Sequence, residues 1–210
     1  MAVGIKGLLR ASILLFSPIT LGWSLPAAAV PVNIPPLMTA GEMLTQLNQR
    51  LVHSKNSAAT LHYWCQQQLN GADDLQIVQE STRPQTPPAD IYQKLQIPEQ
   101  TPLRYLKQRF IHQGKVIAVF DYWYRPDMLT AKMQQALAEQ HTALVSIARQ
   151  ADFYRLSLGN TPRWPEQGAM PPFVLEHEAV IYRSDSKPFS LIQEHYSQQL
   201  LPRAQQLNPY

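Results

Sequence analysis

The residues best suited to chemistry lie near the C-terminal end of the chain. Residues 173–197 contain two strand-like runs, rich in β-branched and aromatic residues, joined by a short polar link. This pattern predicts an antiparallel hairpin. Because strand side chains alternate between two faces, Glu194 is expected to share a face with Ile192 and Tyr196. A carboxylate between apolar neighbours is costly to bury unless it has a partner, and such groups cluster at functional sites.

The hairpin itself offers one partner for Glu194. With a turn centred on residues 185–186, His177 is predicted to lie opposite Glu194, and Glu176 opposite His195. A bulge would shift this register. A histidine beside a carboxylate is suited to proton transfer, and a modestly stabilising structural pair is the alternative interpretation.

The middle of the chain offers a cationic partner. Residues 103–112 and 116–124 flank a Gln-Gly-Lys turn, which predicts another hairpin. Lys107 and Arg109 are two residues apart and therefore face the same side. If that side faces Glu194, the cation can bind the carboxylate of a small acid while Glu194 binds or protonates an oxygen at the other end. The alternative is a solvated face, which is the usual place for such charges.

Several other chemistries have no motif in this sequence. There is no Gly-x-Ser-x-Gly elbow and no Gly-rich phosphate loop. No two histidines have the helical spacing of a metal site, and Glu194 and His195 face opposite ways. Cys65 is the single cysteine and is expected to be a small buried residue on a helix. We therefore expect a site for a small acid that uses no cofactor and no metal.

The net charge and the N-terminal segment indicate which partners and which cellular location to expect. The formal net charge is +3 and the basic residues are scattered, which argues against a nucleic-acid partner. Residues 1–29 have the parts of a secretory signal peptide: two early basic residues, a short apolar run and a final Ala-Ala-Ala. They predict a periplasmic or secreted protein with no stable membrane anchor after cleavage. Residues 30–38 would be a proline-rich tether, and residues 39–210 one domain.

The order of the predicted elements indicates an α+β fold. Hairpins with segregated helices favour a single antiparallel sheet. Thr39 and Glu42 form a capping-box pattern, and Ser57 is expected to cap the second helix. The expected elements are helices at 39–53 and 57–69, a strand at 75–80, helical turns at 89–95, the hairpin at 103–124, helices at 127–138 and 143–151, a strand at 153–158, a loop at 160–172 and the final hairpin.

The two hairpins resemble those of chorismate lyase. Residues 103–126, with the runs RFIHQGKVI and DYWYRP, resemble its central hairpin, and residues 175–196, with KPF and IQEHY, its closing hairpin. The effector-binding domain of many bacterial transcription regulators is similar in these stretches. The likeness covers about residues 58–200 and consists of short motifs. It implies an antiparallel sheet wrapped around an internal ligand cavity, with helices on one side and as flaps.

The resemblance also implies a reaction. Chorismate lyase eliminates enolpyruvate from chorismate, giving 4-hydroxybenzoate and pyruvate without a metal or cofactor. Glu194 matches a glutamate that contacts the hydroxyl end of the ring. An arginine that binds the ring carboxylate matches Lys107 in a gap-free alignment, or Arg109 after a small shift. Lysine lacks the planar guanidinium group that binds a carboxylate through two hydrogen bonds. The gap-free alignment, which places Lys107 at this position, therefore favours lyase activity less than the shifted alignment, which places Arg109 there.

Three functions follow from these patterns. In the first, a lyase-like elimination uses Glu194 as general acid or hydroxyl anchor and Arg109 or Lys107 as carboxylate clamp, with His177 assisting. In the second, an exported non-catalytic protein binds a small aromatic or hydroxy acid. In the third, the protein's own side chains fill the cavity. Export favours the second and third, because chorismate is a cytoplasmic metabolite, and the sequence leaves the oligomeric state open.

Overall fold

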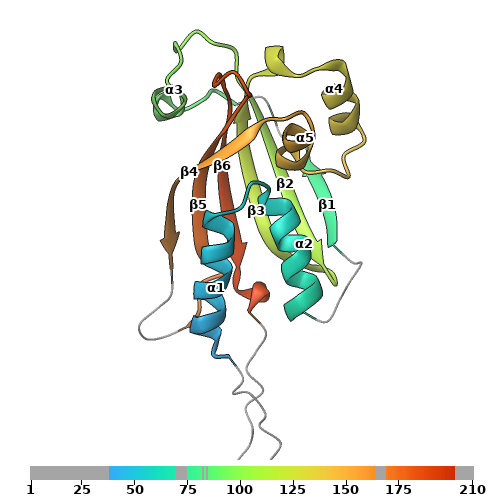
Figure 1. Cartoon of the computed structure of the whole chain (residues 1–210), viewed down its shortest axis with the longest axis vertical. Coiled ribbons are helices and arrows are strands. Elements are labelled where there is room, and N and C mark those ends of the chain that lie inside the picture. The colour runs from blue at the N-terminus through green and yellow to red at the C-terminus, as the bar shows by residue number, and fades with distance from the viewer. Residues whose placement is uncertain (1–37, 70–74, 82, 84, 164–168, 202–210) are drawn as a thin grey trace, which may run out of the picture. The chain divides into compact units, whose positions relative to one another are not determined.

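Six strands form one antiparallel sheet in the computed structural model, which describes residues 38–69, 75–81, 83, 85–163 and 169–201. The strand order is β1-β2-β3-β6-β5-β4, so both predicted hairpins lie at the centre of the sheet (Figure 1). The α+β class and the single antiparallel sheet are confirmed. The strands are β1 (Leu75–Glu80), β2 (Arg104–His112), β3 (Lys115–Tyr124), β4 (Tyr154–Pro162), β5 (Phe173–Tyr182) and β6 (Pro188–Ser197).

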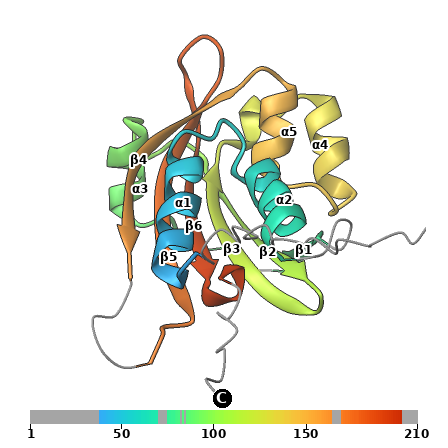
Figure 2. The ribbon, with the colours of Figure 1, turned by 60° about the horizontal axis from the view of Figure 1, so that its bottom comes forward.

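Helices α1 and α2 lie side by side over one face of the sheet (Figure 2). Both present buried apolar residues to the sheet, and the main core lies between these two layers. A smaller apolar cluster, which includes Ile91 and Leu95 of α3, covers part of the opposite face. The described helices are α1 (Ala40–Val52), α2 (Ser57–Gln68), α3 (Ala89–Leu95), α4 (Ala131–Ala138) and α5 (Leu144–Gln150), with short 3-10 turns η1 (Pro126–Met128) and η2 (Gln198–Leu200).

The start of α1 is confirmed, whereas the cap of α2 differs from the prediction. The Glu42 amide donates to the Thr39 hydroxyl over 3.2 Å, and the Thr39 amide donates to the Glu42 carboxylate over 2.7 Å. At α2, Asn56 is the cap and accepts from the Ala59 amide over 3.3 Å. Ser57 is the first helical residue, so its hydroxyl is free to turn toward the sheet.

Two other elements depart from the expected bounds. The helix expected at 127–138 is divided, because the extended residues Leu129 and Thr130 follow η1 and Thr130 caps α4. Strand β4 continues to Pro162, into the expected loop, because that residue still pairs with Leu175 of β5. Part of that loop, residues 164–168, lies outside the described residues.

The expected signal peptide lies outside the described residues, as does most of the expected tether. All described residues belong to one compact unit, Leu37–Tyr210. Within the described part of the chain, the helices are too short or too polar to cross a membrane. Cys65 lies on α2 and is fully buried, as expected, and burial raises the pKa of its thiol to about 11.

Candidate functional site

Glu194 points to the interior, as its position in the alternating strand predicted. The carboxylate is fully buried on the face covered by α1 and α2, together with Ile192 and Tyr196. The predicted register of the last hairpin is also confirmed, since His177 pairs with Glu194 and Glu176 with His195. These pairings bring a buried carboxylate and a buried imidazole to adjacent strands under the same helices.

The partner of Glu194 is Arg155 of β4, a residue that the sequence patterns do not predict. Arg155 Nη2 donates to Glu194 Oε2 over 2.8 Å, and Nε donates to Oε1 over 3.2 Å. The two side chains are 1% and 0% exposed, so the two-pronged pair is enclosed by protein. Burial acts to lower the pKa of Arg155, but the Glu194 carboxylate more than offsets it and the pKa lies above its ordinary value.

Lys107 and Arg109 do not meet Glu194, and that prediction was wrong. The inward side chains of β2 are its even-numbered ones, so both cations lie on the opposite face of the sheet. Lys107 lies 4.0 Å from Asp121, and Arg109 lies 2.7 Å from Glu80. A role for either residue in binding a ligand together with Glu194 would require it to cross the sheet.

Two hydroxyl groups complete the shell around Glu194. Ser57 Oγ donates to Glu194 Oε1 over 2.6 Å, and Tyr196 Oη donates to Oε2 over 2.7 Å. With the two contacts from Arg155, each carboxylate oxygen accepts one hydrogen bond from the guanidinium and one from a hydroxyl. Such a shell allows a charge to be buried.

The Arg155–Glu194 pair also joins the sheet to the corner between α1 and α2. Arg155 Nη1 faces the carbonyl oxygens of Leu51, at 3.4 Å, and Ser54, at 3.5 Å, at the C-terminal end of α1. Glu194 contacts Ser57 at the N-terminal end of α2. The cation thus meets the negative end of one helix dipole and the carboxylate the positive end of another, an arrangement that stabilises both charges.

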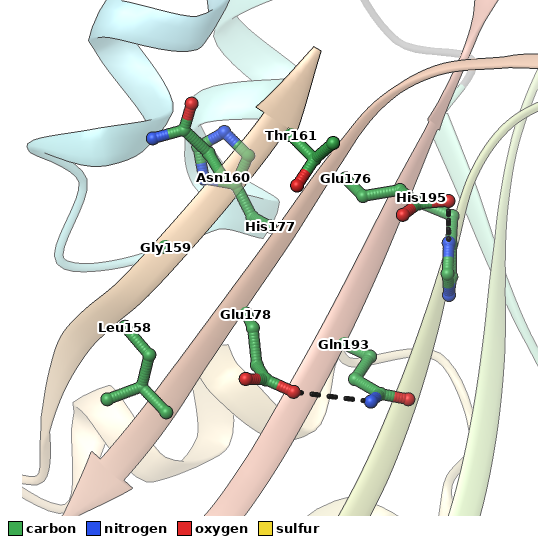
Figure 3. Close-up of a pocket in the computed structure, with 9 residues that line it drawn as sticks. All are labelled: Leu158, Gly159, Asn160, Thr161, Glu176, His177, Glu178, Gln193 and His195. Carbon is green, nitrogen blue, oxygen red and sulfur yellow. Dashed lines mark hydrogen bonds and ion pairs between the residues drawn. The ribbon is translucent and has the colours of Figure 1, made fainter. Parts of the chain in front are cut away.

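His177 lies beside this centre and is held by α1. Its Nε2 lies 2.7 Å from Asn48 Oδ1, and Asn48 Nδ2 donates to Asn160 Oδ1 over 3.0 Å. This chain places the ring proton on Nε2 and leaves Nδ1 as an acceptor, which has no partner in the structure. Burial, offset in part by Glu194, lowers the pKa of His177 to about 4, so the ring is neutral at pH 7. Figure 3 shows the His177 ring next to Asn160.

Tyr122 of β3 carries a second unsatisfied group near the centre. Its side chain is fully buried, and its hydroxyl approaches the Val145 amide without forming a hydrogen bond of normal geometry. Burial and the charge of Glu194 raise the pKa of Tyr122 well above its usual value, so the phenol remains a proton donor. The region around Arg155 and Glu194 therefore contains two buried polar groups, the Tyr122 hydroxyl and His177 Nδ1, that have no hydrogen-bond partner.

The opposite face of the sheet has charged groups of a different kind. A hollow of about 380 Å³ there contains two contacting pairs, Glu178 with Gln193 at 3.3 Å and Glu176 with His195 at 3.5 Å (Figure 3). Lys94 also donates to Glu178 over 2.7 Å. These charged groups satisfy one another, as in an ordinary surface network, and the unpaired group among the described lining residues is Nδ1 of His177. Within the described residues, no cluster of three or more His, Cys, Asp or Glu side chains is arranged to hold a metal ion.

Comparisons with known proteins find similarities at low sequence identity. No family model matches the chain. It is 27% identical over 178 residues to the uncharacterized protein y4mC of Sinorhizobium fredii, covering 76% of this chain and 75% of that one.

Similar solved structures include domains of transcriptional regulators. The effector domain of PhnF from Mycobacterium smegmatis has a TM-score of 0.45 at 12% identity, over 59% of this chain and 80% of that one. The ligand-binding domain of a GntR-family regulator from Bordetella bronchiseptica has a TM-score of 0.42 at 13% identity, over 58% and 82%. A regulator of Bacillus subtilis, YydK, has a TM-score of 0.43 at 13% identity, over 60% of this chain and 58% of that one. Alignments at this level assign no function to the chain.

Proposed function

We propose that this protein binds a small organic acid beneath α1 and α2, with Arg155 as the group that holds the ligand carboxylate. One observation carries the proposal: an enclosed, two-pronged arginine–carboxylate pair joins β4 and β6 beneath the α1–α2 corner. A buried ion pair is a poor source of stability, because desolvation offsets much of its attraction. A planar guanidinium in a dry site is, however, well suited to recognising a carboxylate.

The geometry favours a hydroxy acid over a plain acid. A ligand carboxylate would take the place of Glu194 on Arg155, and Glu194 would lose two hydrogen bonds. A hydroxyl group on the ligand can donate to Glu194 and replace one of them, while Ser57 and Tyr196 keep theirs. The phenol of Tyr122 could donate to the same ligand, because its proton is not used in the closed structure.

Binding requires movement of the α1–α2 corner. Neither member of the pair is reachable from solvent, since Arg155 and Glu194 are 1% and 0% exposed at their side chains. Both members contact the corner directly, at Leu51 and at Ser57. A ligand that occupies Arg155 therefore changes the contacts that hold the corner closed, and the ligand's affinity depends on the free energy of opening.

Catalysis is the second candidate, favoured by the inward position of Glu194 on the last strand, where the resemblance to chorismate lyase requires a glutamate. The other expected component is missing from that face, because Lys107 and Arg109 lie on the opposite side of the sheet. Elimination of pyruvate from chorismate would thus have to use Arg155 as the clamp. Formation of 4-hydroxybenzoate by purified protein tests this activity, and its absence at high protein concentration would leave binding alone.

Matched acids and matched variants test the binding proposal. Titration calorimetry with benzoate, 4-hydroxybenzoate, lactate and chorismate should show binding of at least one hydroxy acid, and 4-hydroxybenzoate should bind more tightly than benzoate. Arg155→Gln should weaken this binding at least tenfold, whereas Glu194→Gln should mainly reduce the preference for 4-hydroxybenzoate. Arg163→Gln, which removes the same charge from an exposed pair with Glu176, should leave the affinity unchanged.

The result that contradicts the proposal is equally direct. If none of the acids binds at 10 mM, or if Arg155→Gln and Arg163→Gln behave alike, Arg155 is not the carboxylate site. Export, expected from residues 1–29, belongs to the same proposal. A fusion of residues 1–38 to alkaline phosphatase tests it, since that enzyme is active only after export.

A further inference from the structure

A second hollow, here called the His112 hollow, lies where β2 turns into β3. Its volume is about 550 Å³, and its described lining includes Leu69, His112, Lys115, Ile117, Met170 and Gln198. The start of α1, the end of α2, the β2–β3 turn and η2 all come together at the lower end of the view in Figure 1. This volume is within the range of pockets that hold small molecules.

The His112 hollow is separate from the Arg155–Glu194 centre. Along β3, Lys115 pairs with His112, whereas Phe120 pairs with Glu194. These two positions on β3 are five residues apart, or roughly 15 Å along an extended strand. A ligand site in the His112 hollow therefore does not rest on the proposed function.

His112 is the observation that points to a ligand. The side chain is 4% exposed, and neither of its ring nitrogens has a hydrogen-bond partner. The large majority of buried polar groups in proteins are paired, so an imidazole with two orphaned nitrogens needs an explanation. A neutral imidazole has one donor and one acceptor, and the donor is satisfied by a carboxylate. A small turn of the ring would present that nitrogen to the hollow.

The backbone at this end of the hairpin is also specialised. Phe110 pairs with Ala118 and Ile111 with Val116, so Ile117 is an unpaired bulge residue that is buried in the wall of the hollow. Bulges commonly re-aim side chains next to functional sites. Gln113, which also lines the hollow, has a φ of 49° in the turn, a region where residues other than glycine and asparagine are disfavoured.

The lining defines the chemistry of the ligand. Lys115 supplies a cation at the rim, and His112 supplies a buried hydrogen-bond donor. Leu69, Ile117 and Met170 supply an apolar part of the lining, and Gln113, Gln198 and Gln199 supply a polar part. We infer that the His112 hollow binds a small monocarboxylic acid with an apolar body, whose carboxylate lies between Lys115 and His112. The cation and the donor fix the charged end, and contact of the apolar end with Leu69, Ile117 and Met170 adds to the affinity.

Hexanoate and 1-hexanol are matched probes, because they share an apolar body and only hexanoate carries a charge. In the full chain with labelled histidines, hexanoate should shift the ring resonances of His112 in a saturable manner, and hexanol should bind at least tenfold more weakly. Lys115→Gln should weaken hexanoate binding at least fivefold. Lys132→Gln, an exposed change on α4, is the control and should have no effect.

Variants at the two centres separate this inference from the proposed function. Arg155→Gln should leave hexanoate binding at His112 intact, and His112→Phe should abolish it while leaving acid binding at Arg155 unchanged. The inference is overturned if hexanoate up to 10 mM leaves the His112 resonances in place, or if Lys115→Gln and Lys132→Gln have the same affinity. Because Lys115 is exposed, its variant will fold even if His112→Phe does not.

Discussion

At the scale of single residues, the charges of Arg155 and Glu194 compensate each other in the interior. Arg155→Met would leave a buried carboxylate with only two hydroxyl donors, Ser57 and Tyr196. We expect a loss of about 3–5 kcal/mol in the free energy of unfolding, as is typical when one partner of a buried pair is removed. The double variant Arg155→Met, Glu194→Met should recover most of that loss in urea unfolding experiments. If the losses of the two single variants instead add up in the double variant, the pair is not coupled.

His177 gives a prediction on pH. Its pKa is about 4 in the folded protein and about 6.5 in an unfolded chain. The unfolded state therefore binds the proton first, so stability is lost as the pH falls from about 6.5 to about 4 and levels off below that. The contribution is at most about 3 kcal/mol. Urea unfolding of His177→Gln should lose this part of the pH dependence, and an unchanged slope would exclude His177 as its source.

Strand alternation explains which site residues could be read from the sequence. The two residues adjacent to Glu194 in sequence point to the other face of the sheet. The residues two positions away on either side, Ile192 and Tyr196, are apolar and share its face, so the inward direction of Glu194 was predicted. Arg155 could not be found in the same way, because Tyr154 and Leu156 on either side of it are 39% and 51% exposed. The usual pattern of apolar residues inside and polar residues outside is reversed there. The reversal is visible only once β5 has been paired with β4.

At the scale of elements, Gln108 of β2 performs the role of a missing helix cap. Helix α5 begins after Ala143, which has no side chain to cap it. The buried Gln108 instead accepts from the Leu144 amide over 3.0 Å and donates to the Thr142 carbonyl over 3.1 Å. A residue on a strand thus fixes the start of a helix that packs over the core.

Substitution of Gln108 tests this role. Gln108→Leu leaves two backbone groups unpaired in the interior and should cost about 1–3 kcal/mol in urea unfolding. Hydrogen exchange at the Leu144 amide should become faster in the same variant. Gln76→Leu, at an exposed position of β1, is the control and should change little. If the Leu144 amide stays protected in Gln108→Leu, the cap comes from elsewhere.

Element boundaries could be predicted where the cause is local, and could not where it is tertiary. Helix α1 begins at the expected capping box, because both of its hydrogen bonds join residues three apart. The final hairpin has the expected pairing of His177 with Glu194, which follows from its short turn together with a one-residue register shift between Ile181 and Tyr182. The cap of α2 was displaced by one residue, since Ser57 is engaged by Glu194, which is far away in sequence. The length of β4 was also missed, because pairing with β5 extends it.

At the scale of the whole molecule, the edge strand β4 carries exposed apolar residues. Leu156 and Leu158 of the edge strand β4 are 51% and 45% exposed. An edge strand with outward apolar side chains promotes pairing with other chains, and charged residues prevent it. Leu156→Lys should slow aggregation on heating, as followed by light scattering, and should change stability by less than about 0.5 kcal/mol. Loss of cooperative unfolding in this variant would instead give Leu156 a structural role.

The fold class could be predicted from the sequence. Of the Arg155–Glu194 pair, only the inward position of Glu194 could. Two hairpins and separate helices implied one antiparallel sheet, and the sheet has that form. Which face each cation occupies depends on how the hairpins align, and here Lys107 and Arg109 lie on the outer face while Arg155 lies on the inner one. The site is thus built from β4 and β6 with the α1–α2 corner.

Arg155 itself provides the most direct test of the central claim. In protein labelled with ¹⁵N, titration with 4-hydroxybenzoate should shift the Arg155 Nε resonance, because that group now donates to Glu194 and would donate to the ligand. The Glu194 carboxylate carbon should shift with the same midpoint, and Arg163 should not respond. Binding of the acid with the Arg155 and Glu194 resonances unmoved would show that the ligand lies elsewhere and would contradict the account.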